Sequence, residues 1–147
     1  MNYIINENKK NTELIIKHIS LLQNRIDNNF KELKNNNINN QEIRYNDGSR
    51  YVGQVINGIR EGKGILYWKD GARYEGDFRN DKRDGKGIFY FNNGNRYEGD
   101  FRNDKREGKG IFYYNNGDRE VGDYYNDNPI GKHVCLTKNG DVITNNY

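Results

Sequence analysis

The sequence predicts a mainly β protein, an elongated single-layer antiparallel sheet of repeated β-hairpins that follows one amphipathic α-helix. From Glu42 onward the chain repeats with a period of 23 residues, and all 17 glycines lie after residue 47. All but two of the aromatic residues lie after residue 40. Because glycine is costly in a strand unless another group approaches closely, this combination indicates rings packed onto bare backbone.

The composition excludes several classes of protein. Hydrophobic residues make up 33% of the chain, below the usual share of roughly 45–50%, so a Leu/Val-cored enzyme domain is not expected. The net charge of +3 comes from 24 basic and 21 acidic residues, whereas nucleic-acid-binding proteins usually have a lopsided basic face. Cys135 has no second cysteine to pair with, and no apolar run approaches the ~18–20 residues of a membrane span. We therefore expect a cytoplasmic protein.

The N-terminal segment, residues 1–40, is predicted to be a helix over about residues 11–34 followed by an asparagine-rich linker. Asn11 or Thr12 is the expected N-cap. The apolar residues recur at spacings of three and four, which places them on one face of the helix: Ile15, Ile19, Leu22, Ile26, Phe30 and Leu33. This face has to be buried, either on the chain's own sheet or on a second helix. The latter predicts a homodimer through residues 12–33.

The remainder, residues 41–147, is predicted to be a strip of repeats. Units begin at Tyr51, Tyr74, Tyr97 and Glu120. The second and third units are identical at 20 of 23 positions, and the first matches the second at 11 of 23. Repetition of this length is typical of architectures in which each unit buries its apolar face only by stacking on its neighbours.

Each unit is predicted to be a β-hairpin. In the second unit two aromatic-rich runs are separated by one turn sequence, Asn80-Asp81-Lys82, and followed by another, Asn92-Asn93-Gly94. Side chains alternate between faces along a strand. One face of the unit therefore holds both rings and glycines: Tyr74, Gly76, Phe78, Gly85, Gly87, Phe89 and Phe91. We expect the rings of one hairpin to lie over the glycines of its neighbour.

These motifs resemble the MORN repeat (membrane occupation and recognition nexus). Its pattern is Tyr-Glu-Gly-x-aromatic, then Gly-Lys-Gly-x-aromatic and a glycine turn. The chain meets it at residues 74–89 and 97–112, and departs from it in the first unit at Val52 and Val55. The resemblance spans roughly residues 43–142. It implies an antiparallel strip of hairpins that acts as a scaffold or tether, and some members of the family are credited with membrane or phosphoinositide contact.

The last unit, residues 120–147, departs from the repeat and is predicted to be a cap. Glu120 replaces the leading tyrosine and His133 replaces the second glycine. Terminal repeats are expected to be atypical, because only one of their sides meets another repeat.

No catalytic or metal-binding pattern is recognisable. The two histidines, His18 and His133, have no fixed spacing to a nucleophile, and His133 with Cys135 makes at most half of a metal site. The three Gly-Lys-Gly triplets lack the Ser/Thr and the strand–loop–helix setting of a P-loop. We therefore predict a non-enzymatic protein with no metal and no cofactor.

A first candidate binding surface lies on the face opposite the glycines. There the second strand of each unit carries an isoleucine and a tyrosine, which form an apolar row that we call the Ile/Tyr stripe: Ile65, Tyr67, Ile88, Tyr90, Ile111 and Tyr113. A row of this kind is rarely left in water. Either the N-terminal helix covers it or it binds a protein partner, and the predicted function is a protein-interaction scaffold or tether.

The turns provide a second candidate, a basic ridge suited to anionic phospholipid headgroups. Its residues recur in the second and third units: Arg79, Lys82, Arg83, Lys86, Arg102, Lys105, Arg106 and Lys109. Acidic residues are interleaved with them, so the second unit, with five bases and four acids, has a net charge of only +1. A peripheral membrane or phosphoinositide-binding tether is therefore the alternative function, and no nucleic-acid partner is expected.

Overall fold

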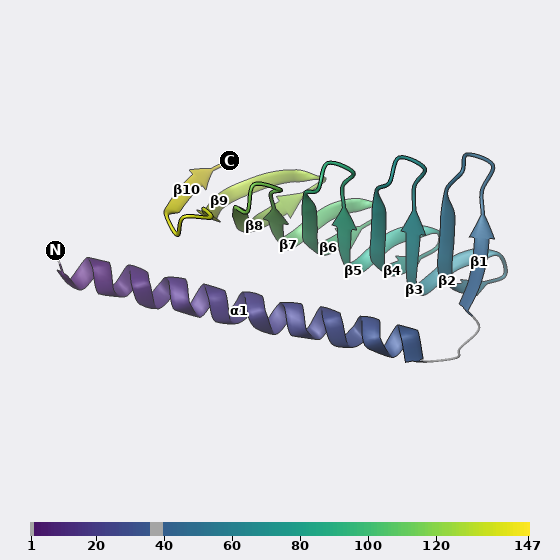
Figure 1. Cartoon of the computed structure of the whole chain (residues 1–147), viewed down its shortest axis with the longest axis horizontal. Coiled ribbons are helices and arrows are strands. Elements are labelled where there is room, and N and C mark those ends of the chain that lie inside the picture. Colours follow the sequence, from purple (N-terminus) through teal and green to yellow (C-terminus); the bar gives the residue numbers. More distant parts are fainter. Residues whose placement is uncertain (1, 36–39) are drawn as a thin grey trace. The chain divides into compact units, whose positions relative to one another are not determined.

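The chain forms one helix and one sheet, which are separate compact units with a boundary between residues 37 and 38. The computed structural model describes the backbone of residues 2–35 and 40–147, and the side chains of residues 12–28 and 40–147. Figure 1 shows both units.

Helix α1 spans Asn2–Asn35. It begins at Asn2, so the prediction of an N-cap at Asn11 or Thr12 is wrong. No proline or glycine precedes those residues, so nothing there stops a helix from continuing toward the N-terminus. Of the predicted apolar face, the side chains of Phe30 and Leu33 lie outside the described residues.

The sheet has ten antiparallel strands whose spatial order follows the chain, so each strand pairs with its sequence neighbours (Figure 1). This confirms the predicted open sheet of hairpins. The strands are β1 (Asn40–Arg44), β2 (Arg50–Ile56), β3 (Ile59–Tyr67), β4 (Arg73–Arg79), β5 (Lys82–Tyr90), β6 (Arg96–Arg102), β7 (Lys105–Tyr113), β8 (Arg119–Tyr125), β9 (Asn128–Leu136) and β10 (Val142–Asn146).

Two kinds of turn join the strands. Within each complete unit a two-residue turn has both residues at positive φ, as in Asn80 (49°) and Asp81 (64°). This is the turn geometry that matches the twist of a hairpin, and asparagine and aspartate tolerate it. Between units a longer turn closes with a hydrogen bond such as that from Trp68 N to Ala72 O, 2.9 Å.

The two glycines of each Gly-Lys-Gly triplet have different structural roles. Gly76 pairs with Gly87, but Phe78 pairs with Arg83, so three residues of β5 stand opposite the single residue Asp77 of β4. The first glycine of the triplet, Gly85, lies inside this β-bulge with a φ of 118°. A β-bulge bends its strand and redirects the side chains beyond it.

The second glycine of the triplet, Gly87, lies beneath a tyrosine ring. A Cβ atom added to Gly87 would lie 2.4 Å from Tyr74. The Tyr74 hydroxyl donates a hydrogen bond to the Asp77 carbonyl oxygen, 3.0 Å away, in the bulge. The expected packing of rings on glycines is therefore present, but each tyrosine covers the glycines of its own hairpin. The expectation that it covers those of the neighbouring hairpin is wrong, since Tyr51, Tyr74 and Tyr97 lie over Gly64, Gly87 and Gly110 of their own units.

Rings connect neighbouring units in two rows. The first ring row runs edge to face with centroids 5.0–5.3 Å apart and contains Tyr51, Phe78, Tyr74, Phe101, Tyr97 and Tyr124. The second ring row has spacings of 4.6–5.6 Å and contains Trp68, Phe89, Phe91, Phe112 and Tyr114. Each such contact contributes about 0.5–1.5 kcal/mol beyond its buried area. A chain with few aliphatic residues builds its core in this way.

Burial of the first ring row also changes its acid–base chemistry. Tyr51, Tyr74 and Tyr97 are fully buried, and this burial raises the pKa of each phenol well above its ordinary value. Burial likewise raises the pKa of Tyr124 to about 12. The hydroxyls are protonated at neutral pH, and those of Tyr51, Tyr74 and Tyr97 donate hydrogen bonds to the backbone carbonyl oxygens of Gln54, Asp77 and Asp100.

Candidate interaction surfaces

The Ile/Tyr stripe lies on the face of the sheet away from the ring rows. None of its six residues belongs to the ring cluster or packs against it. Ile88 and Ile111 are nevertheless buried, at 5% and 4% exposed, and the other four are half-buried. Across the sheet its isoleucines alternate with glutamates, since Ile88 pairs with Glu75 on one side and Glu98 on the other. Its tyrosines alternate with arginines, as Tyr90 does with Arg73 and Arg96. Apolar and charged side chains therefore alternate from strand to strand along the stripe.

Each tyrosine of the stripe is covered by the arginine of the strand before it. The guanidinium carbons of Arg50, Arg73 and Arg96 lie 4.3, 3.9 and 4.0 Å from the ring centroids of Tyr67, Tyr90 and Tyr113. These are cation–π distances. Two of the arginines also pair with glutamates, at 2.7 Å for Arg73 with Glu75 and 2.8 Å for Arg96 with Glu98. The second and third units therefore present the same apolar and charged groups in the same order, whereas the first unit has Val52 in place of the glutamate.

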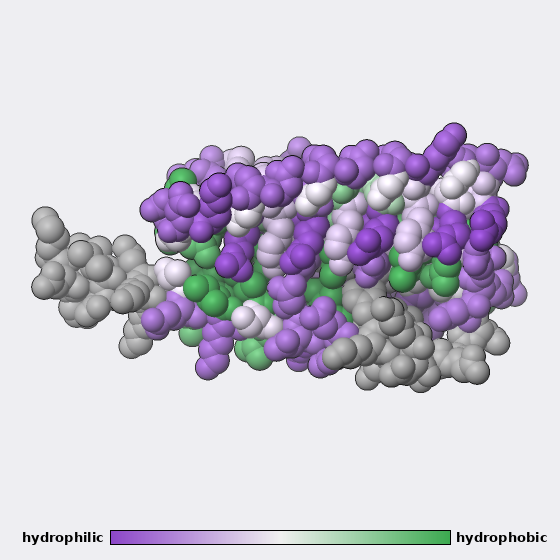
Figure 2. Space-filling view, viewed as in Figure 1, coloured by the Kyte–Doolittle hydropathy of each residue, from purple (hydrophilic) through white to green (hydrophobic). Residues whose placement is uncertain are grey.

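The basic ridge does not form as one surface. Arg83 and Arg106 are paired with Phe78 and Phe101, so they lie on the ring-bearing face. The other six point elsewhere. Two lysines donate hydrogen bonds to asparagines, and the rest form ion pairs with acidic residues: Lys82–Asn103, Lys105–Asn126, Arg79–Asp84, Arg102–Glu107, Lys86–Asp100 and Lys109–Asp123. Exposed ion pairs of this kind contribute little to stability. Figure 2 shows that the opposite edge, formed by the turns between units, is also hydrophilic.

An arginine clamp between units was not predicted from the sequence. Arg83 binds Asp104 in the turn of the next unit, through its backbone N (3.0 Å) and Nε (3.1 Å) to Asp104 Oδ1, and through Nη2 to the Asp104 carbonyl. Arg60 with Asp81 and Arg106 with Asp127 repeat this arrangement. The sequence does contain a signal for this clamp, because each of these arginines is followed 21 residues later by its aspartate.

In the last unit the buried ring comes from the opposite strand. A Cβ atom added to Gly122 of β8 would lie 2.1 Å from the ring of His133, which is fully buried in β9. His133 Nε2 lies 2.9 Å from the Asp123 carbonyl oxygen. The imidazole thus takes both the space and the hydrogen bond that belong to the tyrosine in the other units.

Glu120, in the tyrosine's sequence position, is 4% exposed. Its carboxylate accepts hydrogen bonds from Tyr114 Oη (2.7 Å), Tyr147 Oη (2.9 Å) and Asn145 Nδ2 (3.0 Å). Burial opposes ionisation, but the hydrogen bonds outweigh it and hold the pKa of Glu120 below its ordinary value. Burial raises the pKa of the neighbouring Cys135 thiol, which disfavours a reactive thiolate. The cluster therefore has the character of a structural cap.

Two absences concern the described residues alone. Within residues 2–35 and 40–147, no group of three or more His, Cys, Asp and Glu side chains is placed to hold a metal ion. In the same part of the chain, no helix combines the length and the apolar composition that crossing a bilayer requires.

Stacked hairpins in chain order define a class, the linear β-repeat proteins. The MORN repeat model matches residues 51–73, 74–96 and 97–119, so this chain is a MORN-repeat protein, as its motifs indicated. No curated protein matches it. Among solved structures it is similar to the "SAS-4 (dCPAP) TCP domain in complex with a Proline Rich Motif of Ana2 (dSTIL) of Drosophila Melanogaster". The identity is 15% over 74% of this chain and 72% of that one, with a TM-score of 0.42. A likeness at this level carries no functional weight.

Proposed function

We propose that this MORN-repeat chain is a non-enzymatic scaffold that binds a protein partner along the Ile/Tyr stripe. The family is generally non-enzymatic, and its repeats suggest protein-interaction or membrane-associated modules. The observation that supports the proposal is the row of stacked tyrosines and arginines that recurs on the face away from the ring cluster. Ile88 and Ile111 are only 5% and 4% exposed, so the half-buried tyrosines and arginines of the row are the groups that a partner would contact.

The chemistry of the stripe favours a protein over a lipid surface. Its arginines are stacked on tyrosines, and Arg73 and Arg96 are also neutralised by glutamates. An anionic membrane would require unpaired positive charge. Tyrosine and arginine are also among the residues that contribute most to protein–protein binding. Each repeat offers the set again after two strands, about 9.6 Å further along the sheet.

The test compares two double variants of the full chain. Because Ile88 and Ile111 are buried, Tyr90→Glu/Tyr113→Glu charges the stripe at its half-buried tyrosines, and Ile56→Glu/Ile130→Glu introduces the same charges at isoleucines outside it that are 60% and 44% exposed. Affinity capture with quantitative mass spectrometry should show partners lost at least about tenfold with the stripe variant and kept with the control. Equal loss with both variants would refute the proposal. Thermal unfolding of the stripe variant at a much lower temperature would place its tyrosines in the core instead.

Two further measurements address the other predicted partners. Light-scattering mass of the full chain, with and without residues 1–40, tests a homodimer through residues 12–33. Vesicle flotation with and without phosphoinositide, at low and near-physiological salt, tests the lipid tether. Flotation that needs the anionic lipid and falls steeply with salt would replace the scaffold proposal.

A further inference from the structure

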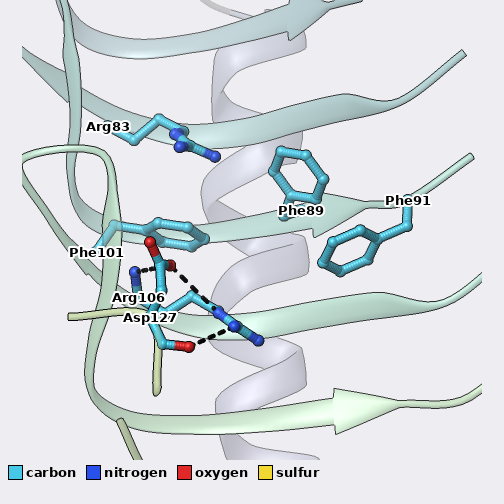
Figure 3. A pocket seen from close by; sticks show the side chains of 6 residues that line it. All are labelled: Arg83, Phe89, Phe91, Phe101, Arg106 and Asp127. Atoms are coloured by element: carbon cyan, nitrogen blue, oxygen red, sulfur yellow. Dashed lines mark hydrogen bonds and ion pairs between the residues drawn. The ribbon is translucent and has the colours of Figure 1, made fainter. Parts of the chain in front are cut away.

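The ring-bearing face holds a pocket that the Ile/Tyr stripe does not share. Its volume is about 130 Å³, and it is lined by Arg83, Phe89, Phe91, Phe101, Arg106 and Asp127 (Figure 3). Pockets for whole small molecules are larger, at about 300–1,000 Å³. A cavity of about 150 Å³ is known to admit benzene. The pocket is therefore the right size for a single ring of five or six atoms.

The walls of the pocket are aromatic on two sides. Figure 3 shows Phe101, from the first ring row, on one side, and Phe89 and Phe91, from the second ring row, on the other. Arg83 lies at one end of the pocket (Figure 3), with its guanidinium carbon 5.4 Å from the Phe89 centroid and 5.5 Å from the Phe101 centroid. A flat apolar ring that enters the pocket has aromatic side chains on both sides.

The pocket offers hydrogen-bond donors without net charge. Arg83 is neutralised by Asp104, and Arg106 by Asp127. Each arginine uses Nε and Nη2 on its aspartate. A guanidinium has five N–H groups, so about three on each arginine are not used by this contact. Donors without net charge suit an uncharged acceptor such as a peptide carbonyl, and they do not favour a phosphate or an acidic chain.

The same surroundings recur along the sheet. One unit earlier, Arg60 lies 5.3 Å from the Phe78 centroid, and Arg83 lies 5.9 Å from that of Trp68. One unit later, Arg106 lies 5.0 Å from the Tyr124 centroid. Units are separated by two strands, or about 9.6 Å. A polyproline II helix advances about 9.3 Å per turn of three residues, and its carbonyls have no internal hydrogen bonds.

We propose that the ring-bearing face binds a proline-rich peptide in the polyproline II conformation, lying across the strands. Every third residue faces the sheet, and one proline ring enters the pocket between Phe91 and Phe101. The free N–H groups of Arg83 and Arg106 donate to the carbonyls of the peptide. Polyproline II segments are typically bound by aromatic-lined grooves, and this site is independent of the Ile/Tyr stripe.

The first test measures the binding of fluorescein-labelled tri-, hexa-, nona- and dodeca-proline to the full chain by fluorescence anisotropy. Affinity should rise with each added turn of three residues and level off beyond nona-proline, when the matching units are used up. Trp68, the single tryptophan, supplies a second signal, since it lies in the second ring row. A glycine–serine nonapeptide is the control. Its binding as tightly as nona-proline, or the lack of saturable binding by nona-proline, would overturn the proposal.

The second test compares neighbouring residues on opposite faces. Phe91→Ala should weaken nona-proline binding by about tenfold or more, whereas Tyr90→Ala should leave it within about twofold. If Phe91→Ala lowers the melting temperature strongly, Phe91→Leu keeps an apolar side chain without the ring and should also weaken binding. Equal losses for Tyr90→Ala and the Phe91 variants would contradict the assignment. So would affinity that falls steeply with salt, because the site is neutral.

Discussion

The second and last units solve the same packing problem from opposite strands. In the second unit Tyr74, on the first strand, covers Gly87 on the second. In the last unit His133, on the second strand, covers Gly122 on the first. Both rings reach a backbone carbonyl in the bulge, at 3.0 Å and 2.9 Å respectively. Each unit therefore needs one ring packed on a glycine and one contact between that ring and a backbone carbonyl oxygen. The ring can come from either strand of the hairpin.

When the ring comes from the second strand, as in the last unit, a carboxylate occupies the tyrosine's position on the first strand. This buried carboxylate, Glu120, needs hydrogen-bond donors. Glu120 is accommodated by three donors, two of which come from the β10 region, Asn145 and Tyr147. The third is the hydroxyl of Tyr114, whose counterpart one unit earlier is Phe91, which has no hydroxyl. A buried carboxylate is tolerated only when it is hydrogen-bonded or paired. Glu120 meets this condition, whereas the neighbouring His133 Nδ1 has no hydrogen-bond partner among the described residues and lies 3.5 Å from Glu120 Oε1.

The largest effect is expected from Gly87→Ala. The added Cβ would lie 2.4 Å from the Tyr74 ring, and overpacking against a ring that cannot move should lower the free energy of unfolding by about 3 kcal/mol or more. Urea denaturation measures it. Tyr74→Leu in the same chain removes the clash, so the two changes should be less than additive. If the two changes in the free energy of unfolding simply add, the Tyr74 ring and the Cβ atom added at Gly87 do not clash.

The exchange itself is tested by restoring the repeat pattern. His133→Gly alone leaves a buried void and should cost about 3 kcal/mol. Adding Glu120→Tyr rebuilds the tyrosine-over-glycine arrangement and should recover most of the loss, to within about 1 kcal/mol of the natural chain. Thermal and urea unfolding give both values. If the double variant Glu120→Tyr/His133→Gly is less stable than His133→Gly, a tyrosine on the first strand cannot replace the histidine on the second strand.

The arginine clamp distinguishes units that have a following turn from the last one, which has Pro129 in place of the arginine. Arg83→Met should cost about 2 kcal/mol, since it removes charge-assisted hydrogen bonds from a side chain that is 20% exposed. Arg79→Met is the matched control. Its side chain is 72% exposed, so it should change stability by less than about 0.5 kcal/mol. Similar effects of the two changes in urea denaturation would refute the clamp.

The smallest effect is a pH dependence confined to the last unit. The pKa of Glu120 is lower in the folded chain than in the unfolded one. Its stabilising contribution is therefore complete above the unfolded value of about 4.3 and is lost as the pH falls through the folded value. The stability difference between the natural chain and Glu120→Gln, about 1 kcal/mol at neutral pH, should shrink below about pH 4. Amide exchange of β10 reports it. A difference that is constant or grows in acid would contradict this assignment.

The sequence by itself determined the open sheet, the hairpins, the ring-and-glycine face and the atypical last unit. These follow from local rules, namely alternation along a strand, turn chemistry and a fixed period. The start of the helix was predicted too late, because the residues before Asn11 have a weak pattern but nothing that stops a helix. The sequence also showed that Glu120 and His133 depart from the repeat pattern. It did not show that the ring of His133 takes the place of the tyrosine ring.

Only the tertiary structure decided the register within each hairpin and the contacts between hairpins. The turn at Asn80 pairs Phe78 with Arg83 and would also pair Gly76 with Gly85, but the bulge pairs Gly76 with Gly87. The pairing next to the turn places Arg83 on the ring-bearing face, where it reaches the ring rows and the next turn, and this divides the predicted basic ridge between two faces. A bulge is stabilised by packing across strands, here a tyrosine on a glycine, so its position does not follow from the pattern within either strand.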